Sequence, residues 1–126
     1  MTQEEKQLLL KDLCARLPYK VKARFCNGVK EERGDVWDID MFSGAINVDY
    51  IIDDVKPYLR PMSSMTEEEQ RTLDSMCNGV EMVSRLSGLK MFDKAFDWLN
   101  AHHFDFRGLI EKGLALEAPE GMYKNE

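Results

Sequence analysis

The sequence predicts an α+β fold: an N-terminal helix, a three-stranded antiparallel β-meander, and then two to three helices packed on one sheet face. Apolar residues recur at helical spacing within residues 2–17 and again beyond residue 66. Between these segments apolar and polar residues alternate, which is typical of half-buried strands. The length of 126 residues indicates one domain. We expect it to span residues 1–119, with 120–126 as a polar tail.

The first helix has clear signals at both ends. Thr2 can cap its N-terminus, and Glu5 stands where a capping box requires an acidic side chain. Pro18 is expected to end the helix, because the residue before a proline avoids helical geometry. The apolar stripe between these ends consists of Leu9, Leu10, Leu13, Cys14 and Leu17.

The predicted sheet begins with a strand over residues 20–25, and residues 27–34 are interpreted as a loop. The other two strands are expected to form a hairpin with Ser43 and Gly44 as its turn. The cross-strand pairs are then Phe42 with Ala45, Met41 with Ile46, Ile39 with Val48, and Trp37 with Tyr50. The apolar face that the helices cover would carry Val21, Ala23, Phe25, Trp37, Ile39, Met41, Ile46, Val48 and Tyr50.

Beyond the sheet, residues 55–61 hold two prolines and are interpreted as a stiff connector. A second helix is expected after Thr66, which forms a capping box with Glu69. The pattern over residues 80–89 leaves helix, strand and loop open. A third helix is predicted over residues 91–102, followed by a short helical turn over residues 107–112, and residues 114–116 are expected to pack on the core.

Composition excludes several classes of function. The formal net charge of −6 disfavours non-specific binding to nucleic acid, which requires a basic surface. The three cysteines are odd in number and lack metal-ligand or redox spacing, so we expect free thiols in a reducing compartment. The polar N-terminus lacks an apolar signal region, and the apolar runs are too short to span a bilayer. We therefore expect a cytoplasmic protein without membrane binding.

Two groups of residues are candidates for a site. Asp38, Asp40 and Asp49 share the polar face of the predicted hairpin, and such a cluster of oxygens suits magnesium or calcium. The same register places Asp38 opposite Asp49, which is destabilising, so neutralisation by the first strand is the simpler interpretation. The neutralising cations would be Lys20, Lys22 and Arg24. The speculative binding residues are Tyr58, Arg60, His102, His103, Asp105 and Arg107.

Each binding candidate also has a structural interpretation. Tyr58 and Arg60 could present donors to an anion at a helix N-terminus, but the acidic residues 67–69 would repel that anion. His102 and His103 are adjacent and therefore point about 100° apart on a helix, which is poor geometry for joint metal ligation. A helix end with Asp105 capping the next turn is the favoured interpretation.

Three segments together resemble a family of uncharacterised small proteins from gut Bacteroidetes and their phages or mobile elements. They are residues 1–19, residues 55–69 with the run Lys56-Pro57-Tyr58-Leu59-Arg60-Pro61, and residues 97–123 with the run Trp98-Leu99-Asn100-Ala101-His102-His103-Phe104-Asp105. The resemblance covers about half of the chain. It implies a bacterial or phage setting and a cytoplasmic location, and it transfers no catalytic residues.

Two hypotheses of function follow. The first is a non-enzymatic protein-binding module, in the family's setting a phage or mobile-element modulator or inhibitor of a host defence machine. The alternative is a divalent-metal-dependent hydrolase or ligand-binding domain that uses the sheet aspartates. The sequence holds no nucleophile motif, phosphate loop or zinc spacing, so we expect no enzyme, no cofactor and another protein as the partner. The oligomeric state stays open.

Overall fold

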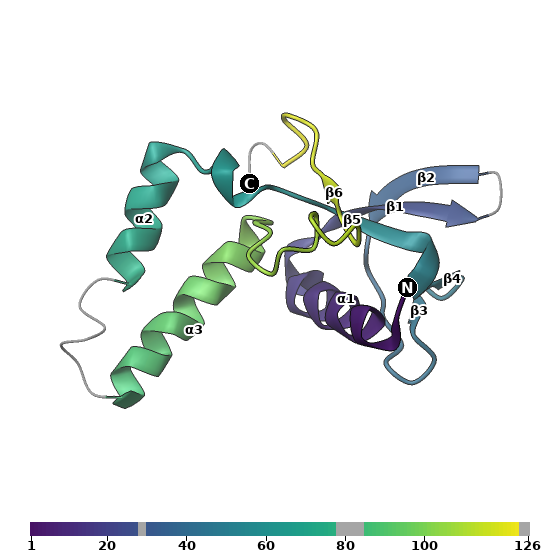
Figure 1. Ribbon diagram of the computed structural model, residues 1–126, viewed down its shortest axis with the longest axis horizontal. Coiled ribbons are helices and arrows are strands. Elements are labelled where there is room, and N and C mark those ends of the chain that lie inside the picture. Colours follow the sequence, from purple (N-terminus) through teal and green to yellow (C-terminus); the bar gives the residue numbers. More distant parts are fainter. Residues whose placement is uncertain (28–29, 78–84, 124–126) are drawn as a thin grey trace.

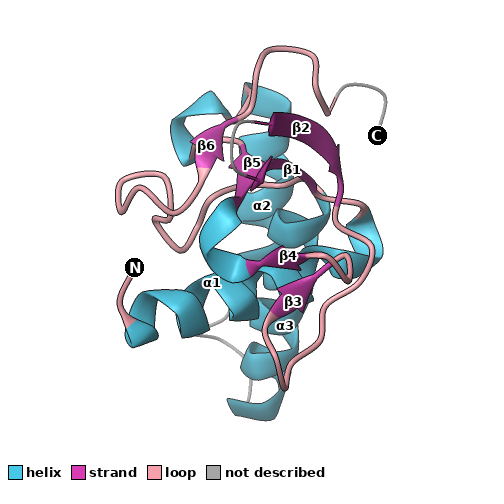
Figure 2. Cartoon of the chain, turned by 90° about the vertical axis from the view of Figure 1, so that its right-hand side faces the viewer, coloured by secondary structure: helices cyan, strands magenta, loops and turns pink. Residues whose placement is uncertain are grey.

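A computed structural model of the chain describes residues 1–27, 30–77 and 85–123. It confirms a combination of helices and sheet (Figures 1 and 2). The helices are α1 (Gln3–Arg16), α2 (Glu67–Cys77) and α3 (Arg85–Ala101), with 3-10 turns at Leu17–Tyr19, Ile52–Asp54 and Met62–Ser64. The strands are β1 (Lys22–Asn27), β2 (Lys30–Asp35), β3 (Ala45–Ile46), β4 (Tyr50–Ile51), β5 (Val55–Leu59) and β6 (Leu116–Glu117).

The two predicted capping boxes are present. Thr2 Oγ1 accepts a hydrogen bond from the Glu5 N–H (3.1 Å), and Glu5 Oε1 accepts one from the Thr2 N–H (2.8 Å). Thr66 and Glu69 repeat the arrangement at the start of α2, with distances of 3.1 and 3.0 Å. These local bonds satisfy N–H groups that a helix start leaves without intrahelical partners.

The main sheet has the strand order β2-β1-β5-β6. The predicted meander is therefore wrong, because the neighbours of β1 are β2 and β5 and not the strands of the predicted hairpin. Residues 30–35, which were expected in a loop, form β2 and pair antiparallel with β1. The expected proline connector forms β5, which pairs antiparallel with β1 and parallel with β6. Pro57 is tolerated there because β6 pairs with β5 only from Tyr58 onward, so at Pro57 the strand has β1 alone as neighbour.

The predicted hairpin register is also wrong. Ile39 bridges to Ile46 instead of Val48, and β3 pairs with β4 in a separate two-stranded sheet. The loop begins at Asp40, whose Oδ1 accepts hydrogen bonds from the N–H groups of Phe42 (2.9 Å) and Ser43 (3.4 Å). This carboxylate starts the turn three residues before the expected Ser43-Gly44 pair, which shifts every later pair.

The core lies between α1, the main sheet and residues 104–115. Figure 1 shows α1 beside the sheet, with α2 and α3 together at the opposite end of the molecule from the β1–β2 hairpin. The sequence predicted that α2 covers the sheet face, and this prediction is wrong. The helix packs on α3 instead, and none of its residues is buried. The buried core comprises Leu9, Leu13, Val21, Ala23, Phe25, Val36, Ile46, Ile52, Val55, Leu59, Leu109, Leu114 and Ala115.

Predictions for the C-terminal third are confirmed only in part. The helix expected over residues 91–102 is α3, which begins at Arg85 and ends at Ala101. Residues 107–112 form turns and no helix. Leu114 and Ala115 pack on the core as expected. Tyr123, which was assigned to a polar tail, is anchored: its hydroxyl donates to the Tyr58 carbonyl (2.6 Å) and accepts from the Lys22 N–H (2.9 Å). Part of the ambiguous stretch, residues 80–84, lies outside the described residues.

Candidate functional site

A buried ionic cluster joins the first helix to the C-terminal third of the chain. Asp12 and Arg16 lie one turn apart on α1, and both side chains are fully buried. Asp12 Oδ2 accepts from Arg16 Nε (2.9 Å), and Oδ1 accepts from Arg107 Nη1 (2.6 Å). Arg16 Nη2 also donates to the Phe104 carbonyl (2.6 Å). One buried carboxylate therefore compensates two guanidinium groups, of which Arg16 is fully buried and Arg107 is 16% exposed.

A second ion pair also contacts Phe104, through the ring of that residue. Arg60 donates two hydrogen bonds to the Glu69 carboxylate, at 2.8 and 2.7 Å, and its guanidinium carbon lies 4.1 Å from the Phe104 ring centroid. Hydrogen bonds from Arg60, in this charge-assisted pair, lower the pKa of Glu69 from 4.5 to about 2. We call Asp12, Arg16, Arg60, Glu69 and Arg107 the ionic junction.

The backbone of Arg60 continues this connection. Its N–H donates to the His103 carbonyl (2.7 Å), and its carbonyl accepts from the Asp105 N–H (2.8 Å). The Asp105 carboxylate accepts from the N–H groups of Leu109 (2.8 Å) and Ile110 (3.0 Å), which fits the predicted capping role. These bonds tie the end of β5 to the segment that follows α3.

The histidines are placed apart. The His102 ring packs on Trp98, with centroids 4.4 Å apart, whereas His103 is buried and stacks on Tyr123 at 3.8 Å. The structure thus brings the six predicted binding residues into one region, but as parts of the packing between β5, α1 and the end of α3. Tyr58 belongs to it through its carbonyl, which accepts from Tyr123.

The aspartates of the metal hypothesis do not share the expected face. The register that would gather Asp38, Asp40 and Asp49 is not formed, because β3 pairs with β4. Asp40 is engaged by its own turn, and the Phe42 and Ser43 hydrogen bonds lower its pKa. Within residues 1–27, 30–77 and 85–123, no group of three His, Cys, Asp or Glu side chains is placed to hold a metal ion. Lys22 pairs with Asp35 (3.0 Å) instead of the hairpin aspartates.

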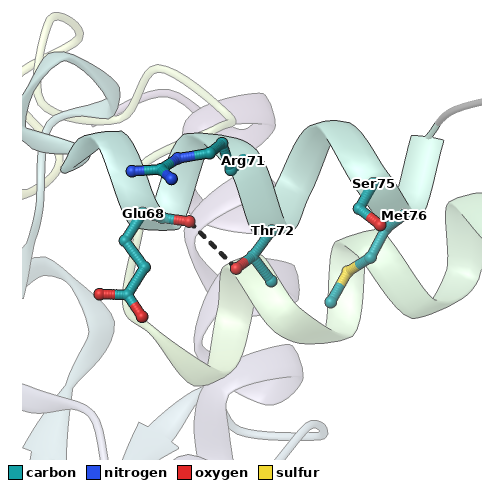
Figure 3. Close-up of a pocket in the computed structure, with 5 residues that line it drawn as sticks. All are labelled: Glu68, Arg71, Thr72, Ser75 and Met76. Carbon is teal, nitrogen blue, oxygen red and sulfur yellow. Dashed lines mark hydrogen bonds between the residues drawn. The ribbon is translucent and has the colours of Figure 1, made fainter.

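Two hollows lie near the helices. One, of about 580 Å³, is bordered by Arg60, Thr66 and Glu69 on one side and by residues 117–121 on the other. The Arg60 guanidinium at this hollow already donates hydrogen bonds to the Glu69 carboxylate. The other, of about 400 Å³, is lined by side chains of α2 alone (Figure 3). There the Thr72 hydroxyl donates to the Glu68 carbonyl of its own helix (3.0 Å), as the dashed line in Figure 3 shows. In the larger hollow the Arg60 guanidinium and the Glu69 carboxylate bind each other, and the smaller hollow lies on the surface of a single helix.

The most exposed apolar side chains in the described part of the chain lie in residues 37–51, which we call the apolar loop. Phe42 is fully exposed, and Trp37 and Met41 are 64% and 60% exposed. Val48 and Ile51 are also more than half exposed. The sequence pattern had assigned Trp37, Met41 and Val48 to the buried sheet face, and this assignment is wrong.

The backbone of the apolar loop is nevertheless fixed. Asn47 Oδ1 accepts from the N–H groups of Trp37 (2.8 Å) and Asp38 (3.1 Å), and its Nδ2 donates to the Asp35 carbonyl (2.9 Å). A Cys14 Sγ–Met41 Sδ contact of 3.3 Å ties the loop to α1. The apolar side chains are thus displayed on a frame of hydrogen bonds.

The loop also contains strained backbone. Val48 has φ = 73° and the preceding Asn47 has φ = 50°. Asn tolerates the left-handed region, but a β-branched residue there is a genuine outlier. Strain of this kind persists where the surrounding structure determines it, and it gathers at functional sites. Residues that favour turns recur every three to four positions in this segment, at Asp40, Gly44 and Asn47. This spacing was the signal in the sequence for a loop instead of two long strands.

No family model, curated protein or solved structure matches the chain. Among the described residues there is no helix whose length and apolar character would let it cross a membrane.

Proposed function

We propose that this chain is a non-enzymatic protein-binding module and that the apolar loop is its binding surface. The full exposure of Phe42, in the same loop as the largely exposed Trp37 and Met41, is the observation that carries the proposal. Exposed apolar side chains that occur together are typical of protein interaction sites, whereas singly scattered ones need no explanation. Aromatic anchors of this kind supply much of the binding energy in protein interfaces.

The fixed backbone of the loop supports the same proposal. A flexible loop would lose conformational entropy on binding, and this loss weakens affinity. The three hydrogen bonds of Asn47 hold the loop before any partner arrives, so most of that ordering cost is already met during folding. A strained residue such as Val48 in an exposed position is consistent with selection for display of side chains over stability.

An enzymatic function has less support from the same residues. The ionic junction holds charged groups, but their hydrogen bonds go to one another, to the backbone and to the side-chain amide of Asn100. The sheet aspartates lack the register on which the metal-dependent hypothesis rested. The loop, in contrast, offers apolar side chains that are more than half exposed, although Met41 also contacts Cys14.

The setting of the module belongs to the proposal as well. The resemblance of residues 1–19, 55–69 and 97–123 to proteins of gut Bacteroidetes and their phages supports a modulator that occupies the surface of a host protein. Small size and the exposed aromatic side chains are consistent with inhibition by surface contact.

A comparative pull-down tests this proposal. The bait variants are wild type, Phe42→Ser and Phe92→Ser, the last being a matched control because Phe92 is 42% exposed on α3, outside the loop. We expect a host protein that is retained in stoichiometric amount by wild type and by Phe92→Ser and is lost with Phe42→Ser. Recovery that is equal for all three baits, or no stoichiometric protein at all, contradicts the proposal.

A further inference from the structure

The charge of the chain is concentrated around the apolar loop. Residues 34–55 hold six of the 23 acidic residues and none of the 17 basic residues or the two histidines. The rest of the chain therefore has 17 acidic and 17 basic side chains and is formally neutral. The six are Asp35, Asp38, Asp40, Asp49, Asp53 and Asp54. The whole net charge of −6 thus lies in residues 34–55, and three of the six acidic residues, Asp38, Asp40 and Asp49, lie within the apolar loop itself.

The fold neutralises only part of this charge. Lys22 pairs with Asp35, and Lys6 pairs with Asp53 at 3.5 Å. In the described part of the chain, neither Lys nor Arg comes within salt-bridge distance of Asp38, Asp40 or Asp49. Asp40 stays ionised, because the hydrogen bond from the Phe42 N–H lowers its pKa. The Asp40 carboxylate, which accepts backbone hydrogen bonds but pairs with no cation in the described part of the chain, therefore lies two residues from Phe42.

We infer that the partner of the apolar loop is a protein surface that presents basic side chains around an apolar pocket, an inference that rests on the proposed function. Charge complementarity selects this occupant. A second copy would bring two loops of like charge together, which is unfavourable. Nucleic acid and anionic lipid surfaces would be repelled for the same reason. A basic protein surface gains from both the exposed rings and the unpaired aspartates.

The contribution of the aspartates should appear mainly in salt dependence. Exposed charges interact over about 10 Å at 0.1 M salt and over less at higher salt. The apolar contacts of Phe42 and Trp37 are not screened in this way. Binding to a basic partner should therefore weaken as salt increases, and a loss of Phe42 should weaken binding at every salt concentration.

The probe for the test is a displayed library of random 12-residue peptides, selected on the wild-type protein and counter-selected on Phe42→Ser. We expect the enriched peptides to combine net positive charge with aromatic or aliphatic residues. A synthetic peptide from this pool should bind about tenfold more weakly at 300 mM than at 50 mM NaCl. The change in Trp37 fluorescence, recorded in a Trp98→Phe background, reports the binding.

Isosteric variants isolate the charge. Asp38→Asn with Asp49→Asn keeps the shape of the loop and should weaken the peptide about fivefold and reduce its salt dependence. Asp93→Asn with Asp97→Asn removes the same charge from exposed positions of α3 and should leave binding within about twofold. If both double variants bind alike, the aspartates of the loop do not select the partner and the inference is wrong.

The remaining outcomes separate the inference from the proposed function. Enrichment of neutral or acidic apolar peptides that still require Phe42 overturns the inference and leaves a protein-binding loop. No enrichment that depends on Phe42 overturns both. Self-association that Phe42→Ser abolishes, measured by sedimentation, would assign the loop to a second copy. Binding to phosphatidylglycerol vesicles that requires Phe42 would replace the protein partner by a membrane.

Discussion

The ionic junction and the apolar loop place charged and apolar groups in opposite ways. In the junction, charged side chains lie in the interior, and Asp12 and Arg16 are fully buried. In the loop, aromatic and aliphatic side chains lie in solvent while charged groups beside them stay unpaired within the described chain. Buried charges persist where partners are supplied by the chain itself. The charges of the ionic junction are thus paired within the chain, whereas no described part of the chain covers the exposed apolar side chains of the loop.

The largest expected effect is at Asp12. Asp12→Ala leaves the buried guanidinium of Arg16 and the partly buried guanidinium of Arg107 without their anion and should lower the free energy of unfolding by about 3–5 kcal/mol. Asp12→Asn keeps a hydrogen-bond acceptor and should lower the free energy of unfolding by less than Asp12→Ala does. Urea unfolding followed by circular dichroism measures both changes.

A matched control separates burial from charge. Asp53→Ala removes the exposed pair with Lys6 and should change the unfolding free energy by about 0–1 kcal/mol. A loss below about 1 kcal/mol for Asp12→Ala would show that the junction is not what joins α1 to the C-terminal third.

The second effect is a pH dependence at Glu69. The hydrogen bonds from Arg60 lower its pKa from 4.5 to about 2 in the folded state, so its stabilisation is complete above pH 4.5 and is lost as the pH falls towards 2. The shift corresponds to at most about 3 kcal/mol, and because the side chain is 19% exposed we expect about 2 kcal/mol. The difference in stability between wild type and Glu69→Gln, measured from pH 7 to pH 2.5, should shrink over that window. A constant difference across the window contradicts this assignment.

Local signals explain which elements the sequence could predict. The capping boxes of Thr2 with Glu5 and Thr66 with Glu69 span three residues, so the starts of α1 and α2 were found correctly. The i to i+4 pair of Asp12 and Arg16 is equally local, but it was not among the predictions. Arg107, in contrast, is 95 residues from Asp12, and only the folded chain reveals that it completes the cluster.

Non-local pairing explains what was missed. The charged run of β2 has no apolar periodicity because its residues are mostly exposed, and β1 alone specifies it as a strand. The hairpin register failed for a different reason: good pairs of large residues were favoured over the turn preference of Asp40. Trp37 and Met41 were therefore predicted to be buried, and the best candidate for a binding surface was hidden by an ordinary hydrophobic pattern.

A smaller effect is expected from relief of strain at Val48. Val48→Gly removes the Cβ that disfavours φ = 73° and should gain about 1–2 kcal/mol, reduced by the about 0.5–1 kcal/mol that glycine loses in conformational freedom. The net expectation is a small rise in the thermal midpoint. Val48→Ala retains the Cβ and should bring no such rise. If the two variants have equal midpoints, strain at this position contributes nothing measurable.

The smallest effect on stability is expected at Phe42, the residue on which the proposed function depends most. Its ring is fully exposed in the folded chain, so Phe42→Ser should change the unfolding free energy by no more than about 0.5 kcal/mol. Phe104→Ala, which removes a fully buried ring from beside Arg60, should cost about 3–5 kcal/mol by the same urea titration. A large destabilisation by Phe42→Ser would mean that the ring packs within the protein, and its exposure would then no longer indicate a partner.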